Sequence, residues 1–304
     1  MRAVGRSDAG GEQVGRKQST AYPRELISIV RTIAALADIY WHPDCFPKEF
    51  KQAQNNWLTA LVQFTAGYAY ERQGAPPAYR TLAREALLSA GSDLERPDPR
   101  FARRVWKEFQ RRAAEQGFAV NRKLNPLNDE RSSRNVSSPG FVASLADFDH
   151  NILLLAKGMI ERGEAEMILL QLQAIRGVGP KIAALYLRDV ARFFELEEQP
   201  GWCFQPVDVW IRRTASYWGE LLHRQGNGDR AAARLLAELA AVAGVRGSDL
   251  NAGTWVLGSQ LLDGELRGVV ISEDGLTVCL ANNLRWSAAI IQALEPLVRK
   301  SNPS

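Results

Sequence analysis

The sequence predicts an all-α protein of two helical lobes with one small β-hairpin near its C-terminal end. Apolar residues recur three or four positions apart through most segments between glycines and prolines, which is typical of amphipathic helices. Only residues 268–272 and 276–280 read as strands, two short apolar runs on either side of an Asp274-Gly275 turn. A chain of 304 residues also has the length of about two domains.

In the first part of the chain, the sequence predicts a disordered basic tail over residues 1–20 and then four helices. Amphipathic patterns cover residues 24–40 and 48–66. A third helix begins at the Pro76-Pro77 pair and stops at Gly91. The fourth has Phe101, Val105 and Phe109 on its core face and ends at Gly117.

The second part begins with a long surface loop over residues 118–140, because this stretch has no periodicity and is rich in Asn, Ser, Pro and charge. Asp149 is the expected N-cap of the helix that follows. Further helices are predicted over 149–163, 164–175, 180–195, 209–224, 229–243 and 248–262.

These elements suggest a division into four parts. They are the tail 1–20, an N-terminal helix 21–46 that packs with the C-terminal lobe, a helical barrel 47–220, and C-terminal helices with the β-hairpin over 221–304. The barrel is expected to contain a helix-hairpin-helix over 164–195 and a Pro-Val-Asp loop over 205–209.

Composition narrows the class of protein. The formal net charge of +4 and pI of about 9.0 permit a polyanionic partner without requiring one. The three cysteines have no Cys-x-x-Cys spacing, which argues against a zinc site or an iron–sulfur cluster. The three histidines are dispersed, so no metal site is expected from side chains. A sparse cysteine count, no signal peptide and no apolar span predict a cytoplasmic protein with no membrane partner.

The most informative stretch is a Gly177-Val178-Gly179 turn between two amphipathic helices, with Pro180 at the first position of the second helix. Backbone N–H groups at such a turn, together with the positive end of the helix dipole, suit a phosphate oxygen. Lys181 stands in the first turn of the second helix, where a positive charge is disfavoured. This position helps the lysine to lose its proton and act as an amine nucleophile.

A second motif follows at residues 205–213, Gln-Pro-Val-Asp-Val-Trp-Ile-Arg-Arg. Asp208 stands where the N-cap of the next helix is expected. A carboxylate beside the amine could also stabilise positive charge on a sugar or shuttle a proton. Arg212 and Arg213 lie one turn later and are placed to meet a DNA strand, although a solvated helix face is an equal alternative.

Together the two motifs resemble the helix-hairpin-helix, Gly/Pro-Asp (HhH-GPD) DNA glycosylase superfamily. The resemblance spans about 40 residues and rests on two segments within that span, Leu172 to Ala183 and Pro206 to Val209. It implies that the hairpin lysine, Lys181, attacks the sugar C1′ and that Asp208 is essential to catalysis. It also implies a two-lobed helical glycosylase fold, with the damaged base entering the cleft between the lobes.

A lysine in this hairpin implies a bifunctional enzyme of base excision repair, a DNA N-glycosylase with β-elimination AP lyase activity through a Schiff base. A lysine without an iron–sulfur cluster is most similar to the 8-oxoguanine glycosylases. The resemblance further implies a monomer acting on double-stranded DNA that contains a damaged base, nucleoid-associated in a prokaryote. No redox cofactor is implied, only a monovalent cation (K⁺ or Na⁺) on carbonyls of the hairpin.

Two departures from the pattern of the 8-oxoguanine glycosylases leave the identity of the excised base open. The segment between Lys181 and Asp208 carries an insert around Glu195–Trp202, and Leu185 stands where the eukaryotic 8-oxoguanine enzymes have a cysteine. The alternatives are a glycosylase for an oxidised pyrimidine or a modified phage base, and a non-catalytic DNA-binding protein. Trp202, Phe204 and Trp255 are candidates to stack on a flipped base, with the protein core as the competing place for each.

Overall fold

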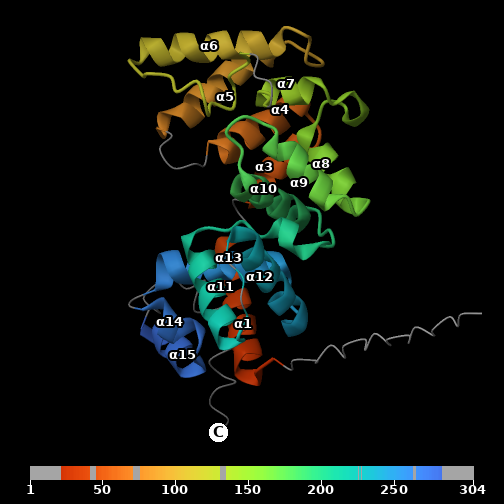
Figure 1. Cartoon of the computed structure of the whole chain (residues 1–304). Coiled ribbons are helices and arrows are strands. Elements are labelled where there is room, and N and C mark those ends of the chain that lie inside the picture. Colours follow the sequence, from red (N-terminus) through yellow and green to blue (C-terminus); the bar gives the residue numbers. More distant parts are fainter. Residues whose placement is uncertain are drawn as a thin grey trace, which may run out of the picture.

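The computed structural model describes residues 22–41, 46–70, 76–130, 135–224, 226, 228–262 and 265–282. These residues are mostly helical, which confirms the all-α prediction. The β pairing within them is a single bridge between Val136 and Ile175. The helices form two bundles, one above the other in Figure 1. None of the described helices has both the length and the apolar character needed to cross a membrane.

The first bundle is built from the middle of the chain and shares one core of buried residues that runs from Phe50 to Phe204. Its helices are α3 (Phe46–Ala53), α4 (Trp57–Val62), the π-helical η1 (Gln63–Ala69), α5 (Ala78–Gly91), α6 (Phe101–Glu115), α7 (Ser138–Ala143), η2 (Ala146–Phe148), α8 (Ile152–Glu161), α9 (Ala165–Gln173), α10 (Pro180–Phe193) and η3 (Gly201–Phe204).

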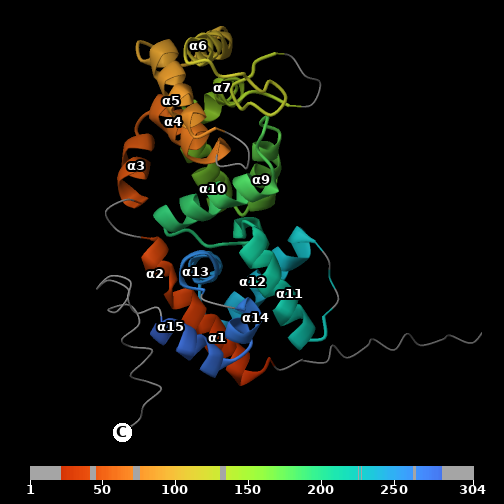
Figure 2. The same cartoon turned by 90° about the vertical axis from the view of Figure 1, so that its left-hand side faces the viewer.

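The second bundle combines the N-terminal helices with the C-terminal part of the chain around a separate core. Its helices are α1 (Arg24–Ala35), α2 (Ala37–Tyr40), α11 (Val209–Leu221), α12 (Asp229–Ala243), α13 (Gly247–Val256), the π-helical η4 (Leu257–Leu261), α14 (Leu266–Val270) and α15 (Glu273–Asn282). Figure 2 shows α1, in red, among the blue C-terminal helices.

The division between the two cores falls between Phe204 and Val207. Helix α11, which we grouped with the 47–220 barrel, therefore packs in the second core through Ile211 and Trp218. Within the described residues, the Pro-Val-Asp loop carries the chain from the first bundle to the second. The tail 1–20 and residues 283–304 lie outside the described residues.

The predicted C-terminal β-hairpin is wrong, because residues 266–270 and 273–282 form helices α14 and α15. The Ser272 hydroxyl accepts a hydrogen bond from the Gly275 N–H, and two acidic residues occupy the first turn of α15, as expected at a helix start. A Cβ on Gly275 would lie 2.2 Å from the Gly268 carbonyl oxygen. Gly275 thus permits a close approach of α15 to α14 rather than a β-turn.

The long loop before the hairpin is held by hydrogen bonds to the first core and to the hairpin turn. The Tyr70 hydroxyl donates to the Asn125 side chain at 2.6 Å, within the first core. At the loop's end, the Val136 N–H donates to the Ala174 carbonyl at 3.0 Å, and the Arg176 N–H donates to the Val136 carbonyl at 2.8 Å. The loop therefore supports the hairpin turn from behind.

One predicted cap is displaced. Asp149 has a left-handed backbone (φ 49°) and lies outside the helix. The N-cap of α8 is Asn151, whose side chain accepts from the N–H groups of Leu153 and Leu154. The same side chain donates to the Ala53 carbonyl at 2.8 Å, so tertiary packing selects the later cap.

Candidate active site

The hairpin turn uses its two glycines for different purposes. Gly177 has a φ of +77°, and a Cβ there would lie 2.2 Å from the Leu124 carbonyl oxygen. The turn therefore requires glycine at this position. Gly179 has an extended backbone (φ −93°, ψ 177°), and a Cβ there would have nothing within 4 Å. A side chain at Gly179 is thus excluded neither by backbone strain nor by contact within the described structure.

Between the glycines, the Val178 side chain is buried in the first core and its N–H donates to the Ile175 carbonyl at 3.0 Å. Val178 therefore holds the turn together from inside. Helix α10 begins directly afterwards, with Gly179 as N-cap and Pro180 at its first position. No side chain of the described residues caps this end. The start of α10 is exposed, and Lys181 is the second residue of the helix.

Asp208 is the N-cap of α11, as predicted. Its Oδ1 accepts from the Trp210 N–H at 2.9 Å and from the Ile211 N–H at 3.0 Å. Both of these bonds end on Oδ1, so neither engages the second carboxylate oxygen, Oδ2. The residue is only partly buried, and its position is fixed while one oxygen is spared for other chemistry.

A cavity of about 260 Å³ joins the two motifs. Lys181 and Val207, the residue before Asp208, both line it, although they are distant in sequence. Its wall comes from α9, the start of α10, the link from η3 to α11, and α12. The lining residues are Glu166, Leu169, Leu170, Gln173, Pro180, Lys181, Ala184, Trp202, Gln205, Val207, Asp229, Arg230 and Ala233.

The aromatic candidates fall in three different places. Trp202 lines the cavity, and the Arg230 guanidinium lies over its ring at 4.5 Å from the centroid. Phe204 is fully buried in the first core and does not belong to the cavity wall. Trp255 is partly buried on α13, edge-on to Tyr40 with ring centroids 5.7 Å apart. Only Trp202 therefore meets the cavity.

The two arginines after Asp208 are both exposed, but each already has a partner. Arg212 forms an ion pair with Asp229, at 2.8 Å. The Arg213 guanidinium lies over the Trp210 ring, 5.7 Å from its centroid. A DNA strand would have to compete with the ion pair to engage Arg212.

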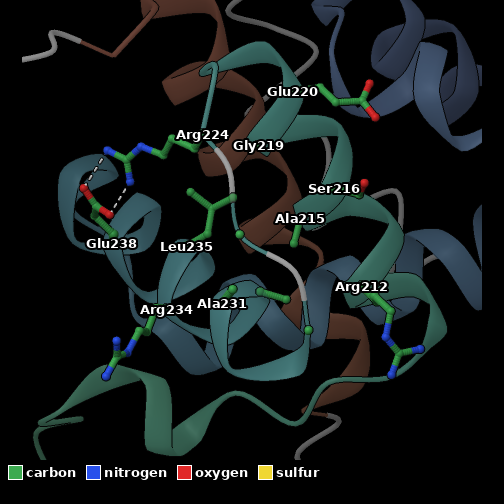
Figure 3. A pocket seen from close by; sticks show the side chains of 13 residues that line it. Arg212, Ala215, Ser216, Gly219, Glu220, Arg224, Ala231, Arg234, Leu235 and Glu238 are labelled. Carbon is green, nitrogen blue, oxygen red and sulfur yellow. Dashed lines mark hydrogen bonds and ion pairs between the residues drawn. The ribbon is translucent and has the colours of Figure 1, made fainter.

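Arg212 also lines a wider pocket of about 880 Å³ between α11 and α12. Figure 3 shows its side chains, with Arg224 and Glu238 paired at the upper left, the Arg234 guanidinium at the lower left and the Arg212 guanidinium at the lower right. The Arg224 Nη2 donates to Glu238 Oε1 at 2.9 Å. Small residues such as Ala215, Gly219 and Ala231 form much of the remaining wall.

No motif in the sequence indicated that α12 would contribute to the cavity. Asp229 and Arg230, at its first turn, close the cavity opposite the hairpin, and Arg230 forms an ion pair with Glu166 of α9 at 3.0 Å. This pair links the two bundles across the cavity. Cys203, next to Trp202 in the chain, is a poor nucleophile, because burial raises the pKa of its thiol to about 12.

A buried ion pair also lies on α10, beyond Lys181. The Arg188 Nε donates to Asp189 Oδ1 at 2.9 Å, and the Tyr68 hydroxyl donates to Asp189 Oδ2 at 2.9 Å. Burial raises the pKa of Asp189, and the neighbouring arginine opposes that shift. Arg188 also donates to the Tyr40 hydroxyl at 2.6 Å, so α10 is attached to the second bundle.

The described residues contain no group of three or more His, Cys, Asp or Glu that could hold a metal ion. The backbone of the hairpin offers oxygens instead. The carbonyls of Ala174 and Ile175 each accept one backbone hydrogen bond, from Val136 and Val178. Each carbonyl has a second lone pair that these bonds do not use.

Comparisons of the chain with protein-family models, with curated proteins and with solved structures found no match.

Proposed function

We propose that this protein is a DNA glycosylase with AP lyase activity that removes a damaged base, 8-oxoguanine in the first instance. The observation that carries the proposal is the cavity that Lys181 shares with the segment leading into Asp208. Lys181 supplies a nucleophilic amine in the wall of this cavity, and Asp208 supplies a carboxylate one residue beyond Val207, which also lines it. These are the two groups that displacement at a sugar carbon requires.

The start of α10 supports phosphate binding in this proposal. Since the Val178 N–H is engaged within the turn, the donors that we assign to a phosphate 3′ to the lesion are the N–H groups of Gly179 and Lys181. The open space around Gly179 lets a phosphate oxygen approach the backbone closely. Carbonyls of the hairpin would hold a monovalent cation that adds positive charge beside that phosphate.

In the proposed reaction the damaged nucleotide is flipped out of the duplex. The Lys181 amine then forms a bond to C1′ while the bond from C1′ to the base breaks. The base leaves with the electron pair of that bond and takes up the proton that the attacking amine loses. Asp208 Oδ2 stabilises the positive charge that develops on the sugar. The sugar ring opens to an imine between C1′ and Lys181, loss of the C2′ proton follows, and the 3′ phosphate leaves by β-elimination.

Borohydride trapping tests this function, because reduction converts the imine into a stable covalent adduct. Wild type and Lys181→Gln are incubated with duplexes that contain 8-oxoguanine, thymine glycol or an abasic site. An adduct on the 8-oxoguanine duplex that is absent from Lys181→Gln would support both the chemistry and the base. Adducts on the abasic or thymine glycol duplex alone would keep the chemistry and reject 8-oxoguanine.

If no duplex gives an adduct while DNA binding persists, the lyase is rejected. Two alternatives then remain, a monofunctional glycosylase that uses water and a non-catalytic protein in which Lys181 only contacts phosphate. Salt-dependent binding alone does not separate the two functions, because both predict it.

A further inference from the structure

A chain of buried hydrogen bonds crosses from α10 to the segment that precedes Asp208. The Arg188 Nη1 donates to Asn251 Oδ1 at 3.0 Å. The Asn251 Nδ2 in turn donates to Gln205 Oε1 at 3.0 Å and to the Pro206 carbonyl at 3.3 Å. Arg188, Asn251 and Gln205 are each no more than 2% exposed. We call these three side chains with the Pro206 carbonyl the buried relay.

Each end of the buried relay leads to one of the two groups in the proposed reaction. Arg188 is seven residues after Lys181 on the continuous helix α10, so both stand on the same face, two turns apart. At the other end, Pro206 precedes Asp208 by two residues, in the segment that crosses between the bundles. Asn251 itself belongs to a third element, α13.

We propose that Asn251 is a positioning residue, which sets the Asp208 segment at a fixed place relative to the helix that carries Lys181. The inference rests on the proposed function, because it assigns a purpose to the relative position of these two groups. Asn251 touches neither of them and acts through Arg188 on one side and Pro206 on the other.

The chemistry of the amide supports this role. Its carbonyl accepts from the guanidinium while its NH₂ donates to two oxygens of the crossing segment. An apolar side chain could do neither, and a carboxylate could only accept. Stability alone is a poor reason for such a group, since replacing buried ionic groups with well-packed apolar ones is often neutral or stabilising. A fixed geometry is a better reason, because small displacements of reacting groups are costly in rate.

The test uses the full-length chain with the substitution Asn251→Asp. This change keeps the size of the side chain and the acceptor for Arg188, but removes the donor to both Gln205 Oε1 and the Pro206 carbonyl. Thr254→Val is the matched control. Thr254 is fully buried one turn later on α13, and its hydroxyl bonds only to the Leu250 carbonyl within that helix.

A second variant guards against a folding defect. Gln205→Met removes the Gln205 Oε1 acceptor and leaves Arg188 fully paired. Among the described residues the Gln205 Nε2 has no hydrogen-bond partner, so no other bond is lost. Because Asn251 still reaches the Pro206 carbonyl in this variant, its effect should be smaller than that of Asn251→Asp.

Two readouts follow the Asp208 segment. The first is the rate of borohydride trapping on a pre-formed abasic duplex, with the dissociation constant for that duplex measured in parallel. Asn251→Asp should lower the trapping rate about tenfold or more with DNA affinity changed less than about twofold. The second is amide exchange at Trp210 and Ile211, which Asp208 caps. Exchange there should accelerate in Asn251→Asp and not in Thr254→Val.

The outcomes distinguish failure of the positioning role of Asn251 from failure of the proposed function on which it rests. If wild type forms an adduct but Asn251→Asp matches it in trapping and exchange, the positioning role is overturned. The same conclusion follows if Thr254→Val is equally impaired. If wild type forms no adduct, the proposed function fails. Faster exchange in Asn251→Asp would then still support the hold on the Asp208 segment, and unchanged exchange would overturn it.

Discussion

Helices α10 and α11 begin beside the same cavity, but only the first turn of α11 is capped by a side chain. At α11 the Asp208 carboxylate accepts from two backbone N–H groups of the first turn. At α10 the N-cap is a glycine, and no described side chain takes that place. A helix start without a cap leaves N–H groups unsatisfied and positive potential exposed. One start is therefore completed by the protein's own anion, while the other is free for an external one.

The sharpest test of this contrast is at α11, where one carboxylate serves as cap and as proposed catalyst. Asp208→Asn keeps an oxygen acceptor at the cap, and asparagine is about as good an N-cap as aspartate. The free energy of unfolding should change by less than about 0.5 kcal/mol. Removal of the negative charge beside the sugar should lower the rate of base excision by about 100-fold or more.

Asp208→Ala is the companion variant, because it removes cap and charge together. It should lose activity to a similar extent and also destabilise the protein by about 1 kcal/mol. Thermal unfolding and single-turnover excision, measured on both variants, separate the roles. An Asp208→Asn protein as active as wild type would leave Asp208 as a cap alone.

The second test concerns Gly177, the first glycine of the turn before α10. Gly177→Ala should destabilise the fold by about 2 kcal/mol or more, because the new Cβ meets both a positive φ and the Leu124 carbonyl. Gly163→Ala is the control, since Gly163 has a similar φ of +75° with nothing within 4 Å of a Cβ.

Gly163→Ala should cost only about 1 kcal/mol, the strain of the backbone alone. Chemical denaturation of the two variants measures the difference, which reports the contact between the hairpin and the 118–140 loop. Equal losses in both variants would show that the loop does not press on the turn as the Leu124 contact implies.

The hairpin and the α11 cap could be predicted from the sequence because local residues determine both. Pro180 and Asp208 act on backbone within four positions of themselves, and such short-range rules hold whatever the rest of the chain does. The positive φ of Gly177 is equally local, although its close approach to the Leu124 carbonyl is not. The strand prediction over 268–280 failed for the opposite reason. Gly275 resembled a turn residue, but glycine is needed there because α15 passes close to the Gly268 carbonyl in another helix.

The candidate site divides in the same way. Lys181 and Asp208 could be selected by their place beside local motifs. Asn251, Asp229 and Arg230 could not, because their roles depend on which bundle each helix joins and how α12 and α13 face α10. Phe204 and Trp202, only two residues apart, show the limit clearly. One is buried in the core and the other lines the cavity, a difference that composition and spacing do not encode.

The last prediction makes the start of α10 resemble the start of α11. Gly179 already has the extended backbone that an N-cap adopts, and its surroundings have room for a side chain. A serine there could accept from the N–H groups of the first turn, so Gly179→Ser should keep or slightly raise the free energy of unfolding, by a few tenths of a kcal/mol. The same oxygen would compete with a DNA phosphate for those donors, and affinity for duplex DNA should fall about three- to tenfold.

Gly179→Ala distinguishes competition from obstruction, because it adds the Cβ without the hydroxyl. If the serine acts by supplying its own acceptor, the alanine variant should bind DNA more tightly than the serine variant at the same salt concentration. If both lose affinity equally, the bulk of the Cβ is what holds the phosphate away. If Gly179→Ser binds DNA as wild type does, the uncapped start of α10 is not the phosphate site, and the contrast between the two helix starts has no bearing on DNA.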